Sequence, residues 1–112
     1  MDEILKNIRR FRDERDWMQF HTPKNLAVSI SIEAAELLEQ FQWKDEAAVE
    51  KHINTHREDI ADELADVAIY LVELADNLHI DLISAMTRKL EKNALKYPIN
   101  KAKGVATKYD KL

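Results

Sequence analysis

Apolar residues recur every three or four positions through most of the first 97 residues, which is the spacing of amphipathic helices. The pattern predicts a first helix over about residues 3–15, with one apolar face formed by Ile4, Leu5, Ile8 and Phe11. It predicts a second helix over about residues 23–42. Thr22 is suited to cap the N-terminus of that helix, and Pro23 is suited to its first position.

Two further helices are predicted in the second half of the chain. A capping-box sequence, Thr55-His-Arg-Glu58, predicts a third helix that runs to about Leu78. Asp81 is expected to cap a fourth helix, which ends before Pro98 because the residue before a proline avoids helical geometry. Residues 44–54 form a polar connector, and a helical turn from Glu46 is compatible with its pattern.

The composition supports an all-α fold with a four-helix protomer. The 112 residues are enough for one domain, and they include only one Gly and two Pro, so the turns of a sheet protein are lacking. We expect a helical domain over residues 1–97 and a basic tail, mobile or held against the domain, over residues 98–112. The second helix is apolar nearly all round, which predicts burial by a second subunit in a homodimer or homotetramer.

The net charge of −4 conceals a strong asymmetry along the chain. Residues 31–83 contain 14 acidic and 3 basic side chains, whereas residues 84–112 contain 8 basic and 2 acidic ones. The acidic part would attract a cation and the basic part an anion, as a metal-bound phosphate compound requires. Alternatively, the two parts complement each other inside the fold or across subunits. The acidic middle makes nucleic acid an unlikely partner.

The sequence lacks the residues and segments that several kinds of site and location require. There is no Cys, which excludes disulfides, thiolate metal sites and cysteine nucleophiles. We see no signal peptide at the N-terminus and no apolar run of membrane-spanning length. These features predict a cytoplasmic protein with no membrane partner.

Four carboxylates form two matched pairs inside the helical patterns, Glu33 with Glu36 and Glu63 with Asp66. Residues three apart share a helix face, so each pair points two oxygen donors the same way. Acidic side chains beside apolar stripes are costly to bury unless they are paired or bind a metal. The alternative is two ordinary solvated acidic faces. The pattern favours an all-oxygen site for Mg²⁺, with Mn²⁺ as a possible substitute.

Other metal sites do not fit the sequence. A di-iron carboxylate bundle needs Glu three residues before His on two helices, and no His in this chain has Glu at that position. The zinc motif His-Glu-x-x-His is also absent.

Aromatic residues lie at the ends of the second helix and on the third. Trp17 and His21 precede the second helix, Trp43 follows it, and Tyr70 lies about 20° from Glu63 around the third. These side chains would form a stacking slot for a planar base. The alternative is ordinary packing at helix ends.

Polar residues on the fourth helix also share one face. Lys89, Asn93 and Lys96 are spaced four and three apart, which is suited to holding a phosphate. The alternative is a solvated basic face near a helix C-terminus, where cations are favoured.

Taken together, these motifs resemble the MazG-like all-α nucleoside triphosphate pyrophosphohydrolases, and within them the dCTP pyrophosphatase branch. The resemblance covers about residues 8–100. It is carried by residues 15–26, Glu33-Ala-Ala-Glu36, Phe41-Gln-Trp-Lys44 and Glu63-Leu-Ala-Asp66-Val-Ala-Ile-Tyr70. Many members have a second Glu where this chain has Ile32, although the dCTP branch resembles this chain in that respect.

The resemblance implies Mg²⁺-dependent hydrolysis of a nucleoside triphosphate to the monophosphate and pyrophosphate, at sites shared between subunits. It implies that the four carboxylates hold the metal. Near the base and sugar it places Trp17, His21, Trp43 and Tyr70, and near the phosphates it places Lys89, Asn93, Lys96 and Tyr97.

Glu36 is our candidate to orient or deprotonate the attacking water, because it lies toward the polar side of its helix. Two other functions compete with this prediction. One is a non-enzymatic helical interaction module with a structural cation. The other is a pyrophosphohydrolase for a different nucleotide, such as dUTP, a modified nucleotide or phosphoribosyl-ATP, since base choice depends on pocket shape and a few hydrogen bonds.

Overall fold

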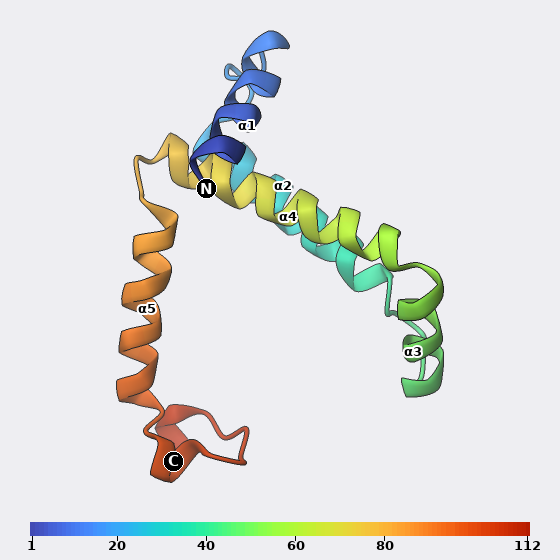
Figure 1. Cartoon of the computed structure of the whole chain (residues 1–112), viewed down its shortest axis with the longest axis vertical. Coiled ribbons are helices and arrows are strands. Elements are labelled where there is room, and N and C mark those ends of the chain that lie inside the picture. The colour runs from blue at the N-terminus through green and yellow to red at the C-terminus, as the bar shows by residue number, and fades with distance from the viewer. The chain divides into compact units, whose positions relative to one another are not determined.

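The computed structural model describes all residues, 1–112, and its regular secondary structure is all helical (Figure 1). The chain forms two compact units, residues 1–79 and 80–112, which we describe separately. The predicted all-α class is confirmed. None of the helices is both long and apolar enough to cross a membrane.

The first unit contains four helices. These are α1 (Asp2–Glu14), α2 (Pro23–Glu39), α3 (Glu46–Thr55) and α4 (Arg57–Asn77). Helix α4 is the centre of the unit, because it contacts each of the other three. Its most extensive interface is with α2, and the two helices run side by side (Figure 1). The two predicted carboxylate pairs therefore lie on neighbouring helices.

Local signals explain where two of the four helices of the first unit begin. The Thr22 hydroxyl accepts a hydrogen bond from the Asn25 N–H at 3.2 Å, with Pro23 at the first helical position as predicted. The connector contains a ten-residue helix, α3, and the Asp45 carboxylate caps it by accepting from the Ala48 N–H at 2.8 Å.

The predicted capping box is wrong. Thr55 is the last residue of α3, and its hydroxyl donates to the Lys51 carbonyl at 2.9 Å. Helix α4 begins after His56, which provides no side-chain cap. The box was misassigned because the connector is itself helical, so Thr55 continues one helix instead of opening the next.

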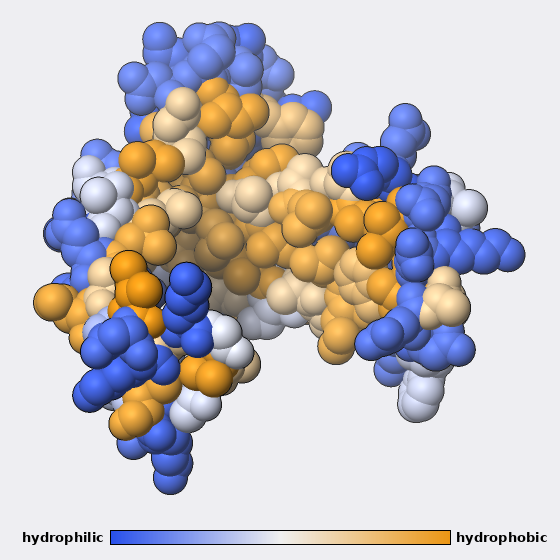
Figure 2. Space-filling model, turned by 60° about the horizontal axis from the view of Figure 1, so that its bottom comes forward, coloured by the Kyte–Doolittle hydropathy of each residue, from blue (hydrophilic) through white to orange (hydrophobic).

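Few side chains are fully buried within the chain. Ile8, Leu26 and Ala75 form the apolar core of the first unit, and Leu26 is only 1% exposed. Apolar side chains reach the surface over much of the molecule (Figure 2), and on α2 and α4 they include Val28, Ile32, Leu38 and Leu64. Exposed apolar surface of this kind is typical of an interaction site. The homodimer or homotetramer stays a prediction.

The second unit contains α5 (Leu82–Lys96), α6 (Ile99–Ala102) and a 3₁₀ turn, η1 (Tyr109–Lys111). Asp81 caps α5 as predicted, since its carboxylate accepts from the Ser84 N–H at 3.1 Å. The tail returns to the end of α5, where the rings of Tyr97 and Tyr109 meet edge to face with their centroids 6.1 Å apart.

Candidate active site

The α2–α4 pair brings three carboxylates together. Glu33 and Glu36 on α2 and Glu63 on α4 each place one oxygen within 4.8 Å of the others. All three side chains are half-buried. The i, i+3 spacing predicted from the sequence therefore produces a real cluster, because the acidic face of α2 meets the acidic face of α4.

The cluster is electrostatically strained without a cation. A hydrogen bond with Glu36, then burial, then the charges of Glu36, Asp66 and Glu63 raise the pKa of Glu33 to about 7. Burial and the neighbouring Glu36 also raise the pKa of Glu63. Two carboxylates can share a hydrogen bond only if one of them holds a proton, and that proton lowers their mutual repulsion.

The acidic cluster also has unused ligand atoms. One carboxylate oxygen of Glu33 and one of Glu63 are buried with no hydrogen-bond partner. A buried polar atom is costly when it is unpaired, and a bound cation would pair both oxygens at once. An all-oxygen donor set is the kind that hard cations such as Mg²⁺ prefer. The residues present therefore fit a hard divalent metal ion.

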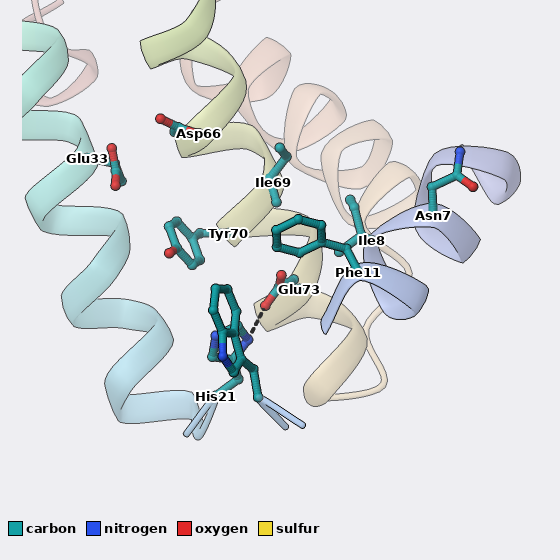
Figure 3. Close-up of a pocket in the computed structure, with 10 residues that line it drawn as sticks. Asn7, Ile8, Phe11, His21, Glu33, Asp66, Ile69, Tyr70 and Glu73 are labelled. Atoms are coloured by element: carbon teal, nitrogen blue, oxygen red, sulfur yellow. Dashed lines mark ion pairs between the residues drawn. The ribbon is translucent and has the colours of Figure 1, made fainter. Parts of the chain in front are cut away.

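A cavity of about 400 Å³ opens beside the acidic cluster, within the first unit (Figure 3). Glu33 and Asp66 line one end of this pocket, and His21 and Glu73 line the other (Figure 3). The remaining walls are formed by Asn7, Ile8, Phe11, Trp17, Ile69 and Tyr70. The pocket is thus acidic at one end and largely apolar and aromatic along its walls, and it is large enough for a small ligand.

The aromatic side chains of this pocket contact one another in series. The Trp17 ring meets Phe11 edge to face at 5.7 Å between centroids and lies 6.0 Å from His21. The His21 ring in turn meets Tyr70 edge to face at 6.3 Å. Burial, together with the charges of nearby carboxylates, raises the pKa of Tyr70, so its phenol remains protonated at neutral pH. A planar base would find several ring faces and edges here.

His21 and Glu73 form a buried ion pair in the pocket, with Nδ1 and Oε2 2.6 Å apart. The two atoms are close but are not aligned for a hydrogen bond, and neither atom has a hydrogen-bond partner. Glu73 is only 5% exposed. The Asn77 amide fixes the same loop by donating to the His21 carbonyl at 3.1 Å.

Glu73 is a pocket residue that the sequence-based prediction of the site omitted. A signal for it was present, since Glu73 lies only about 20° from Asp66 around the helix and two turns further along it.

Comparison with known proteins identifies the family of this chain. Residues 28–112 match the sequence model of the MazG-like family. The chain belongs to the MazG-like family. It is 43% identical to rat dCTP pyrophosphatase 1 and 41% identical to the human protein of that name, in each case over 99% of this chain and 69% of the relative.

A solved structure resembles this MazG-like chain closely. It is a pyrophosphatase from Archaeoglobus fulgidus with 50% sequence identity and a TM-score of 0.84, and the match covers 88% of this chain and 92% of that one. The all-α MazG-like fold predicted from the sequence is confirmed by this likeness.

Most of the predicted site residues of this MazG-like protein meet in the first unit. Glu36 and Glu63 lie in the acidic cluster, and the pocket lining includes Trp17, His21, Glu33, Asp66 and Tyr70. Asp66 is not among the three closest carboxylates, but its charge acts on both Glu33 and Glu63.

Trp43 belongs to the first unit but does not line this pocket. Trp43 is 94% exposed on the turn after α2, with a positive φ of 63°. Lys89, Asn93, Lys96 and Tyr97 belong to the second unit, on α5 and at its C-terminal end. There, the Lys96 ammonium lies 4.8 Å from the centre of the Tyr109 ring. Binding roles for these five residues stay predictions.

Proposed function

We propose that this MazG-like protein hydrolyses a nucleoside triphosphate, dCTP or a close relative of it, to the monophosphate and pyrophosphate. The observation that carries the proposal is the shared wall of the two sites: Glu33 belongs both to the acidic cluster and to the aromatic pocket. A ligand in the pocket would meet a metal-binding end and a base-stacking end at once. The dCTP pyrophosphatases and the archaeal pyrophosphatase that resemble this chain support the same chemistry.

The proposed metal is Mg²⁺, with Mn²⁺ as a substitute, held by Glu33, Glu36, Glu63 and Asp66. When bound, Mg²⁺ would neutralise phosphate charge and lower the pKa of a coordinated water. One oxygen of Glu33 and one of Glu63 are buried without a hydrogen-bond partner, so coordination to the ion would offset the free-energy cost of their burial.

The chain's own residues would position the reactants. Glu36 would orient the attacking water toward the α-phosphorus and accept its proton. Trp17, His21 and Tyr70 would hold the base away from the acidic end, so that the triphosphate extends toward Glu33 and Asp66. No covalent intermediate is expected, because the site offers no activated nucleophile.

A nucleotide panel tests the proposal. Purified protein is incubated with the common ribonucleoside and deoxyribonucleoside triphosphates, with Mg²⁺ or with EDTA, and both products are quantified. We expect equal amounts of monophosphate and pyrophosphate, only with the metal, and fastest from dCTP. Release of inorganic phosphate and a diphosphate would indicate a different reaction. No hydrolysis of any nucleotide would favour the interaction-module alternative.

A further inference from the structure

We propose that Glu73 selects the substrate base, by accepting a hydrogen bond from an exocyclic amino group such as that of cytosine. This inference rests on the proposed function and deepens it, because it assigns base choice to one carboxylate. The residues implied by the family resemblance near the base are aromatic, and a ring face stacks on every base alike. Stacking alone therefore does not distinguish one base from another, and a polar group on the pocket wall is needed for that.

The position of Glu73 suits that role. It lies on α4 seven residues after Asp66, which places it about 10 Å further along the helix axis. The two carboxylates line opposite ends of the same pocket, with Tyr70 between them (Figure 3). A nucleotide with its phosphates at the acidic cluster would extend its base toward Glu73.

The carboxylate of Glu73 is buried beside His21. One of its oxygens faces His21 Nδ1 at 2.6 Å, and the other points away from His21 (Figure 3). The Arg12 side chain, which is also buried, carries a positive charge close enough to interact with Glu73. As a carboxylate, Glu73 can only accept hydrogen bonds, so its second oxygen offers an acceptor to the base.

An acceptor at this place discriminates by chemistry. The 4-amino group of cytosine is a donor, and acidic side chains accept from it in known base recognition. Uracil and thymine carry an oxygen at the same position, which would face the carboxylate lone pair to lone pair and leave both unpaired. A site built to bond a polar group strongly rejects the analogue that lacks it.

The experiment compares kcat/KM for dCTP and dUTP in the parent protein and in Glu73→Gln. Glutamine keeps the shape and can still offer its oxygen to His21, but its amide now presents a donor to the base. We expect the dCTP-to-dUTP ratio to fall at least about tenfold in Glu73→Gln. Glu50→Gln, on the exposed face of α3, is the matched control and should leave the ratio unchanged.

A substrate analogue provides a test that needs no variant. The triphosphate of the pyrimidin-2-one deoxynucleoside has hydrogen in place of the 4-amino group, and the parent protein should hydrolyse it at least about tenfold less efficiently than dCTP. Equal efficiency overturns the inference even if Glu73→Gln does not fold.

The outcomes separate this inference from the proposed function. Hydrolysis of dCTP and dUTP with a ratio that Glu73→Gln does not alter overturns the inference alone. A variant in which both rates fall equally overturns it as well, because that result shows a structural role only. Absence of hydrolysis by the parent protein overturns the proposed function, and the inference with it.

Discussion

Glu33 and Glu63 belong to different helices, yet both lie in the same acidic cluster, and each has one buried carboxylate oxygen without a hydrogen-bond partner. Like charges at this separation repel, and the repulsion is relieved only by a proton or a cation. The packing of α2 against α4 therefore brings negative charges together at a cost in free energy. The proposed metal would convert this local repulsion into a bond between the two helices.

Replacing one ligand should separate catalysis from folding. In Glu63→Gln we expect kcat for dCTP to fall by about 10²–10³, because the amide carries no charge with which to hold the metal. The helical content by circular dichroism should match the parent, since the change removes one repulsive charge and leaves the apolar packing intact. Glu58→Gln, on the exposed first turn of α4, is the matched control. Parent-like turnover in Glu63→Gln would show that the acidic cluster is not the catalytic metal site.

The stability of the metal-free protein should depend on pH through Glu33. Its pKa is raised from 4.5 to about 7, so between these values the folded state holds a proton that the unfolded state has released. The free energy of unfolding therefore decreases as pH rises from about 4.5 through 7. The melting temperature in EDTA should fall over this range, and it should fall less steeply in Glu33→Gln.

The same linkage predicts how Mg²⁺ acts. The ion competes with the proton, so the rise in melting temperature on adding Mg²⁺ should be larger at pH 8 than at pH 5. Thermal unfolding followed by circular dichroism at the two pH values measures the difference. An equal rise at both pH values would show that the ion does not bind at the titrating carboxylates.

Trp17 should contribute to nucleotide binding more than to chemistry. Stacking of a base on an aromatic ring is worth about 1–3 kcal/mol, so Trp17→Ala should raise KM for dCTP roughly 5- to 150-fold and change kcat little. Phe20→Ala removes a neighbouring aromatic ring that is exposed and outside the pocket, and it should leave KM unchanged. If the two variants bind dCTP equally well, the aromatic pocket is not the base site.

The sequence predicted those parts of the site that depend on spacing within one helix. Glu33 with Glu36, and Glu63 with Tyr70, share faces because the helical repeat requires it. The sequence-based prediction failed for residues whose conformation depends on a neighbouring element. Thr55 has the local signature of a cap, but the preceding helix incorporates it. Trp43 follows α2 in sequence, but a turn with positive φ directs it into solvent.

Glu73 is another residue whose environment depends on an element distant in the sequence. Its position on the helical wheel is close to that of Asp66, but burying a carboxylate is unfavourable without a partner, so the sequence alone did not predict its burial. That partner, His21, lies far away in the sequence on a loop, and only the packing of the loop against α4 brings the two together.

Asp76 should matter to the pocket although it lies outside it. Its carboxylate accepts hydrogen bonds from Arg9, and it also faces Arg12, so it ties α1 to α4. The hydrogen bond to Arg9 lowers the pKa of Asp76, so this tie stabilises the fold at neutral pH and is lost as pH falls below about 4.

We expect Asp76→Asn to lower the melting temperature at pH 7 by about 3–8 °C, and the difference from the parent should shrink at pH 3. Because α1 supplies Ile8 and Phe11 to the pocket, KM for dCTP should rise as well. Asp110→Asn removes an exposed carboxylate from the second unit and should change neither quantity. A melting temperature that falls in Asp76→Asn while KM stays at the parent value would show that α1 stabilises the fold without shaping the nucleotide site.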